Sequence, residues 1–344
     1  MSAAVAVTFI LIIVVLAWLY DMVNGMNDCA NAIATTVSTR ALSPVGAILL
    51  AAGLNFAGAL VSTQVARTVG KGVIPPEFFT DQKMLGSVVM VSSLVGAVVW
   101  AYICTRGGIP ISITHSIVGG LAGGGLCAGG LGLLNPRGLT KILVAMVTSP
   151  LIGFLFAYLF TAGVFWIARR VRPQRARPLF RRLQLVSAGY MALSHGMNDA
   201  QNAMGVISAT LIIHGFVIPR AANEFPVPIW VRIGSALFMG LGTFVGGRAV
   251  IRTMGQRIFK IEPEHGFAAE TSAASVILGM SLVGAPISTT HVVSTSVMGV
   301  GATAGFRNVQ WGIAGHIIFT WVLTIPGSAL IAAATFAPLR IFLL

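Results

Sequence analysis

Long apolar runs recur from one end of the chain to the other. The clearest runs are residues 4–20, 44–66, 84–104, 142–168, 230–250 and 312–336, and a glycine-rich run covers 116–134. An α-helix needs about 20 mostly apolar residues to cross a hydrocarbon core about 30 Å thick. The pattern therefore predicts an all-α polytopic membrane protein, with shorter or interrupted helices between the clear membrane segments.

Composition agrees with this pattern. The chain has 344 residues, of which 56% are hydrophobic and 9% are charged, whereas an ordinary soluble domain carries about 25% charged residues. The net charge of +13 would suggest a nucleic-acid partner in a soluble protein. Here seven arginines and no acid lie together in residues 169–182, between two apolar halves. Basic loops stay on the cytoplasmic side of membranes, so we expect a cytoplasmic linker and no nucleic-acid partner.

Three motifs occur twice, in the same order. GMNDCANAIATTVST (25–39) returns as GMNDAQNAMGVISAT (196–210), PISITH (110–115) as PISTTH (286–291), and VARTVGK (65–71) as VIRTMGQ (250–256). The offsets are 171, 176 and 185 residues (196−25, 286−110 and 250−65), similar enough to indicate one duplicated unit. The chain thus divides into a first repeat, 1–168, the basic linker 169–182, and a second repeat, 183–344.

Each repeat contains about five membrane segments. An odd number turns the second repeat upside down relative to the first, which predicts two inverted-topology repeats. Many secondary transporters share this plan, with broken or re-entrant helices and a substrate site at the repeat interface.

The GMND motif places acids and amides inside apolar sequence. An ionised Asp at the centre of a membrane helix costs about 3 kcal/mol on insertion scales, so it needs a partner, water or a bound cation. Gly25 and Gly196 would permit a helix break that exposes backbone carbonyls. Oxygen ligands suit Na⁺ or a shared proton. The predicted coupling-cation residues are Asn27, Asp28, Asn31, Asn198, Asp199 and Asn202, with a possible Na⁺ at Asp28 and Asp199. The alternative is that the amides only cap helix breaks.

The PIS-x-TH motif has the features of an anion site. A proline and a serine after glycine predict a helix start, whose unpaired N–H groups and positive dipole end attract anions. The candidate anion-binding residues are Ser112, Thr114, His115, Ser288, Thr289, Thr290 and His291. The alternative is that these hydroxyls bond back to their own helices.

Two further residues stand outside the duplicated motifs. His195 precedes the second GMND, but Asn24 occupies the equivalent place in the first copy, so no shared role is expected of it. Glu270, in the run AAETSAA (268–274) at an expected segment start, is a further candidate for a cation site.

The two motifs, their order and the basic linker resemble the inorganic phosphate transporter (PiT) family, and specifically its short bacterial members. The resemblance covers nearly the whole chain, for example GAPISTTHVVSTSVMGVGAT (284–303). It implies an inverted-repeat fold with two re-entrant regions and secondary transport of phosphate coupled to H⁺ or Na⁺. The chain departs from the family pattern at Ile113, which replaces the middle Thr of the first copy, and at Asn27, where many short members carry His.

The function expected is therefore symport of inorganic phosphate with H⁺ or Na⁺ across the plasma membrane, without catalysis or any cofactor beyond a possible Na⁺. Sulfate transport is an alternative, because both ions are tetrahedral oxyanions. A hydrolase using Ser288, His291 and Asp199 is a second alternative, disfavoured because no Gly-x-Ser-x-Gly element accompanies the serine. A homodimer is compatible with the glycine-rich run 119–132.

Overall fold

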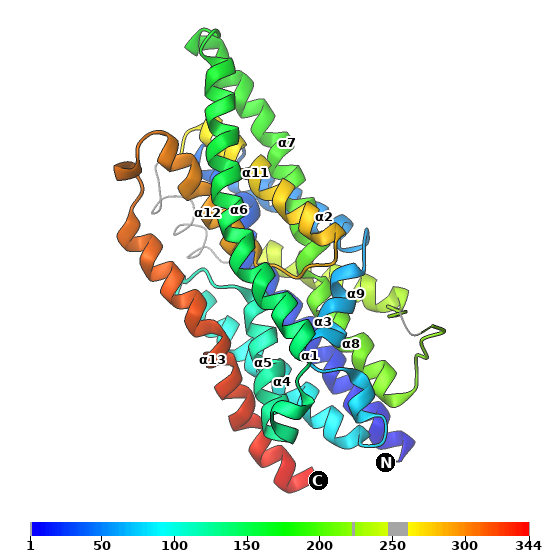
Figure 1. The fold of residues 1–344 in the computed structure, drawn as a ribbon. Helices are drawn as coiled ribbons and strands as arrows, with labels where there is room; N and C mark the ends of the chain where they lie inside the picture. The colour runs from blue at the N-terminus through cyan, green and yellow to red at the C-terminus, as the bar shows by residue number, and fades with distance from the viewer. Residues whose placement is uncertain (1, 222–223, 247–260, 344) are drawn as a thin grey trace.

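The computed structural model describes residues 2–221, 224–246 and 261–343, and every regular element in these ranges is a helix (Figure 1). The elements are α1 (Ala3–Ser38), α2 (Pro44–Ala59), α3 (Gln64–Gly72), η1 (Pro76–Phe79), α4 (Lys83–Arg106), α5 (Ile113–Gly129), η2 (Gly130–Leu133), α6 (Pro136–Ala168), α7 (Pro173–Asp199), α8 (Gln201–His214), α9 (Ile229–Val245), α11 (Pro263–Leu282), α12 (Thr289–Thr303), η4 (Phe306–Asn308) and α13 (Trp311–Leu343). The predicted all-α fold is confirmed.

Several helices have the length and composition of membrane spans. In the described ranges, α1, α4, α5 with η2, α6 and α13 qualify, which makes five. The predicted segment 44–66 is divided between α2 and α3, which meet at a bend of 72° and together would make a sixth span. Only the first few residues of the predicted basic linker connect α6 to α7, because α7 already begins at Pro173. The third repeated motif, at 250–256, lies outside the described residues.

The predicted helix breaks at the GMND glycines are wrong. Helix α1 runs through Gly25 without interruption, and α7 continues through Gly196 until Asp199, where α8 takes over after Ala200. Both glycines instead allow close helix packing. A Cβ atom on Gly25 would collide with the backbone of α9, and one on Gly196 would collide with the backbone of Asn55 in α2.

Two helical hairpins meet tip to tip. Helices α4 and α5 pack side by side and are joined by residues 107–112, and α11 and α12 form a similar pair joined by 283–288. The first pair lies in the lower part of Figure 1 and the second in the upper part. The rings of His115 and His291, at the starts of α5 and α12, have centroids 4.5 Å apart. The helix starts that were predicted after the two PIS motifs are confirmed, with each proline two residues ahead of the serine that caps the helix.

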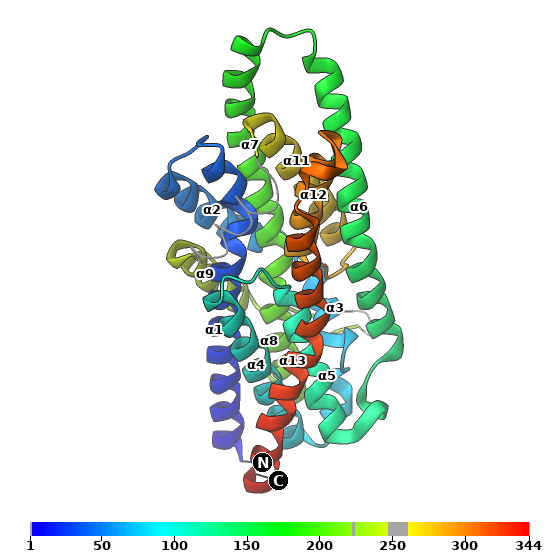
Figure 2. The same cartoon turned by 90° about the vertical axis from the view of Figure 1, so that its left-hand side faces the viewer.

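Packing is reciprocal between the two halves. Helix α1 packs on α9 while α2 packs on α7, and α5 packs on α13 while α12 packs on α6. Both chain termini lie at one end of the molecule, and the turn between α6 and α7 lies at the other end (Figure 2). This is the arrangement that an inverted duplication would produce, and the repeat relation itself stays a prediction.

Candidate functional site

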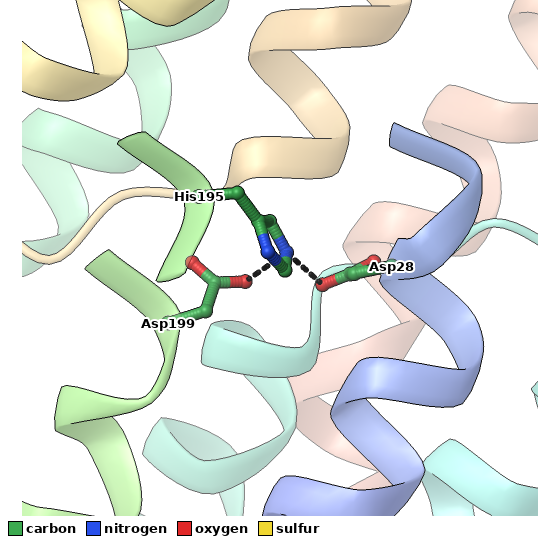
Figure 3. A group of neighbouring side chains, drawn as sticks. All are labelled: Asp28, His195 and Asp199. Atoms are coloured by element: carbon green, nitrogen blue, oxygen red, sulfur yellow. Dashed lines mark ion pairs between the residues drawn. The ribbon is translucent and has the colours of Figure 1, made fainter. Parts of the chain in front are cut away.

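Three ionisable side chains meet in the interior, between α1 and α7. His195 lies between Asp28 and Asp199, with its Nε2 atom 3.8 Å from Asp28 Oδ2 and 3.3 Å from Asp199 Oδ2 (Figure 3). His195 and Asp199 are four residues apart and therefore share one face of α7. Asp28, His195 and Asp199 are all at most 1% exposed. Two buried carboxylates this close together stay ionised only with a positive charge between them, and otherwise one of them holds a proton.

The hydrogen bonds around His195 fix which of its nitrogens is available. Thr243 donates its hydroxyl to the Met239 carbonyl and so accepts from the Asn55 amide nitrogen, 3.0 Å away. The Asn55 amide oxygen must then face His195 Nδ1, at 3.0 Å, and Nδ1 carries the hydrogen. His195 Nε2 is thereby directed at the two carboxylates. It either carries a proton or donates its lone pair to a cation held there.

The tip of the second hairpin closes over this acidic pair. At the start of α12, Thr290 donates to Asp28 Oδ1 at 2.7 Å and Thr289 donates to Asp199 Oδ2 at 3.0 Å. Hydrogen bonds to a charged acceptor are roughly twice as strong as neutral ones. The predicted cation and anion residues therefore form one continuous cluster at this point rather than two separate sites.

The four asparagines of the GMND motifs all use their amide nitrogens as donors to hydroxyl groups. The bonds are Asn27 to Thr105 (2.8 Å), Asn31 to Thr290 (3.0 Å), Asn198 to Ser281 (2.8 Å) and Asn202 to Thr114 (3.1 Å). Three of these hydroxyls donate elsewhere, to the Ala101 and Ile277 carbonyls and to Asp28, which fixes the orientation of the amides.

The oxygens of these amides have no donor. Within the described part of the chain, Oδ1 of Asn27, Asn31, Asn198 and Asn202 and Oδ1 of Asp199 are buried without a hydrogen-bond partner. Buried oxygens that lack donors are costly unless something positive satisfies them. A cluster with many acceptors and few donors is suited to a hard cation that takes oxygen ligands.

The hairpin tips carry the opposite chemistry. His115 Nδ1 and Nε2 and His291 Nε2 are buried, and none has a hydrogen-bond partner among the residues described. His291 also stacks on Trp321, with ring centroids 3.7 Å apart. A neutral imidazole has one donor nitrogen and one acceptor nitrogen, so each ring can offer one N–H to an anion. Histidine donors at the tips and unpaired oxygens on the GMND helices give the two kinds of ion different partners within the one cluster.

The serines of the PIS motifs have a structural task in this conformation. Ser112 accepts from the His115 backbone N–H at 3.1 Å, and Ser288 accepts from that of His291 at 3.2 Å. Each serine is the N-cap of its helix, α5 or α12. The expected bonding of hydroxyls back to their own helices holds for these two residues, and their contribution to an anion site stays a prediction.

Two outcomes differ from what the sequence suggested. His195, for which no shared role was expected, lies at the centre of the site, and its position four residues before Asp199 was the available signal. Glu270 is separate from the acid pair: its carboxylate accepts hydrogen bonds from Thr35, Thr36 and Ser187.

A serine hydrolase site is not formed. The Ser288 hydroxyl bonds to the His291 backbone, and the His291 ring lies against Trp321 rather than against the serine. Asp199 contacts Thr289 and His195 instead of His291. The nucleophile, base and acid of a triad therefore lack the contacts that such a mechanism needs.

A bundle of membrane-length helices with a buried cluster of acids, amides and histidines between two hairpin tips has the plan of a multi-pass membrane transport protein. A family model described as "Phosphate transporter family" matches residues 24–174 and 167–332. The chain belongs to this family.

Similar proteins agree. The chain is 40% identical to a probable low-affinity inorganic phosphate transporter of Bacillus subtilis, over 95% of this chain and 96% of that protein. It is also 40% identical to one of Rhizobium meliloti, over 97% of both. A solved structure titled "The sodium-dependent phosphate transporter" superposes with a TM-score of 0.87 at 28% identity, covering 98% of this chain and all of the other. The family resemblance read from the motifs is confirmed, and inorganic phosphate is the substrate.

Proposed function

We propose that this transporter is a symporter, which moves inorganic phosphate together with a cation, H⁺ or Na⁺. The observation that carries this proposal is the enclosed group of Asp28, His195 and Asp199, whose carboxylates are bonded to the threonines of a hairpin tip. The name of the sodium-dependent structural neighbour favours a cation-coupled mechanism of the same kind.

The cation would be held at the acid pair. With H⁺, the proton resides on His195 Nε2 between the two carboxylates. With Na⁺, the ligands are Asp28, Asp199 and the unpaired amide oxygens of the GMND asparagines. Both arrangements supply the positive charge that two buried carboxylates require.

Phosphate would lie against the hairpin tips. The capped helix starts at Ser112 and Ser288 present the positive ends of α5 and α12. The threonine hydroxyls and the free nitrogens of His115 and His291 add donors. In this proposal Thr289 and Thr290 exchange bonds: they release the carboxylates when the cation binds and turn toward the anion.

This exchange explains why the two ions move together. Phosphate bound without the cation would place further negative charge beside two buried carboxylates, which costs several kcal/mol in a low-dielectric interior. A ligand shifts a conformational equilibrium only by its differential affinity for the two states. In this proposal the step that exposes the site to the other side is permitted when both ions are bound, or when neither is bound and the threonines bond to the carboxylates instead. Two inverted repeats, with α1 and α7 as equivalent helices, provide the moving halves.

The orientation follows from charge. We place the protein in the plasma membrane with the arginine-rich segment 169–182 in the cytoplasm, because basic connections stay inside. Both termini then face the outside, since they lie at the opposite end of the molecule (Figure 2).

Uptake of radiolabelled phosphate into proteoliposomes tests the proposal. A Na⁺ gradient and a pH gradient are imposed separately, with ionophores that collapse each gradient as controls. The proposal expects one gradient to drive accumulation above equilibrium. Phosphate flux that is indifferent to both gradients would contradict symport and indicate a passive pathway. Excess sulfate in the same assay measures selectivity between the two oxyanions.

A further inference from the structure

The polar face of α1 extends beyond the acid pair. Asp21, Asn24, Asp28, Asn31 and Thr35 follow one another at separations of three, four, three and four residues. This spacing places them along one face of a helix. Asp21 lies seven residues before Asp28, which corresponds to about 10 Å along the helix toward the end that carries the termini.

The polar atoms at this end of the stripe have no partner. Asp21 and Asn24 are fully buried, and within the described ranges both carboxylate oxygens of Asp21 and both amide atoms of Asn24 lack a hydrogen bond. Ser235 of α9 lies beside the Asp21 carboxylate, and its equally buried hydroxyl is the side-chain donor within reach of that carboxylate among the described residues. An ionised carboxylate in such a position is expensive unless a cation compensates it.

Packing alone does not require these polar groups, as the other half of the molecule indicates. The offset of 171 residues pairs Asp21 with Ala192 (192−21), which is fully buried. Gly58 packs on the Leu193 backbone as Gly242 packs on that of Met22, so α2 and α9 correspond with an offset of 184 residues (242−58). That offset pairs Ser235 with Ala51 (235−51).

Ala51 is 1% exposed, so both counterparts are small buried residues. The same helix contact is therefore made with two alanines in one half and with an acid and a hydroxyl in the other. A buried acid that packing does not need, with one hydroxyl as its donor and an unpaired amide beside it, is best explained by a ligand.

We propose that Asp21, Asn24 and Ser235 form a second cation site, which binds Na⁺ or a similar hard monovalent metal ion on the side of the acid pair nearer the termini. The ligands are the Asp21 carboxylate, the Asn24 amide oxygen and the Ser235 hydroxyl, all of them oxygens, as such ions prefer. The site rests on the proposed function in that its ion would enter the transport cycle with phosphate. Asp21 is also close enough to Asp199 for their charges to repel, so each carboxylate strengthens the attraction of a cation to the other site, and an ion at either site weakens occupation of the other.

Equilibrium binding of ²²Na⁺ to the purified full-length protein in detergent, without phosphate, tests this site apart from transport. Wild type is compared with Asp21→Asn, Asp28→Asn and the double variant. Asp81→Asn, at an exposed position, serves as a matched control. We expect Asp21→Asn to bind one ion fewer than wild type, or to bind it at least tenfold more weakly. Asp28→Asn should retain the ion at Asp21, and Asp81→Asn should match wild type.

The second site would be overturned if Asp21→Asn bound as many sodium ions as wild type, with the same affinity. It would also be overturned if wild type bound no sodium ion at all. Asp21→Ala, which copies Ala192, controls for folding, and its thermal unfolding is measured with that of Asp21→Asn. If both variants fail to fold, the position is structural and the inference is wrong. If wild-type phosphate flux ignores both gradients while Asp21→Asn still loses its ion, the symport proposal fails and this site stands.

Discussion

The two halves of the molecule share a scaffold but differ in the residues around the buried acid pair. Asn27 bonds Thr105 as Asn198 bonds Ser281, and Asn31 bonds Thr290 as Asn202 bonds Thr114. The serine caps of α5 and α12 are equivalent, and so are the glycine contacts of α1 with α9 and of α7 with α2. These matched pairs set the positions of the helices in both halves.

The two halves differ at residues that contact the buried acids Asp28 and Asp199. Thr289 donates to Asp199, whereas its counterpart Ile113 has no hydroxyl to offer. His195 bridges the acids, whereas its counterpart Asn24 is buried without a partner among the described residues. The helix framework is thus matched between the two halves, whereas the surroundings of the two acids are unequal. The start of α5 offers one hydroxyl fewer than the start of α12, because Ile113 stands where α12 has Thr289.

The largest effect is expected when either acid is neutralised. Asp28→Asn and Asp199→Asn each remove one of two charges that hold the cation. A loss of about 3 kcal/mol corresponds to a decrease of roughly 100-fold in cation affinity. Phosphate accumulation in proteoliposomes should fall to background in both variants, while Asp81→Asn should accumulate normally. Full activity in only one acid variant would show that the halves hold the ion unequally.

The shared scaffold is tested by the glycines of α2. A Cβ on Gly58 would collide with the Leu193 backbone, whereas Gly53, on the same helix, has no atom near that position. Overpacking costs about 1–3 kcal/mol, so Gly58→Ala should lower the thermal unfolding temperature of the detergent-solubilised protein. Gly53→Ala is the control and should leave it unchanged or raise it, because alanine favours the helix. Equal unfolding temperatures would contradict the close contact of α2 with α7.

A smaller effect is expected from the hydroxyl that only the second half possesses. Thr289→Val keeps the shape and removes the hydrogen bond to Asp199. Bonds to charged groups contribute about 1.5–3 kcal/mol, so the cation concentration that half-activates uptake should change by about tenfold or more. Thr295→Val on the same helix is the matched control, because the Thr295 hydroxyl bonds its own backbone. Identical cation dependence in both variants would remove Thr289 from the site.

The smallest effect should come from the helix caps. Ser112→Ala and Ser288→Ala each remove an N-cap, at a cost of about 1 kcal/mol. Because the caps are equivalent, the two variants should lose similar thermal stability. If Ser288→Ala also weakens phosphate binding much more than Ser112→Ala does, the serine of the second half contacts the anion as well as capping its helix.

The sequence was sufficient to predict the long helices and the two acids, but not the helix packing at the glycines or the contact of His195 with the acids. Hydropathy predicted the long helices, and the duplicated motifs located Asp28 and Asp199. The helix breaks at Gly25 and Gly196 were wrong, because glycine also serves close packing, and only the neighbouring helix decides between the two. His195 was underestimated because it lacks a duplicate, and its link through Asn55 to Thr243 joins three helices that are distant in sequence.

Phosphate binding to the purified protein, with and without the cation that drives uptake, tests the central claim most directly. Binding of the two ions is coupled if each raises the affinity for the other by the same factor. The account predicts that the cation tightens phosphate binding by about tenfold or more in wild type, the coupling of 1–3 kcal/mol that linked sites show, and has no effect in Asp28→Asn. Equal phosphate affinity with and without the cation in wild type, or an undiminished cation effect in Asp28→Asn, would show that the buried acid pair is not where the two ions are coupled.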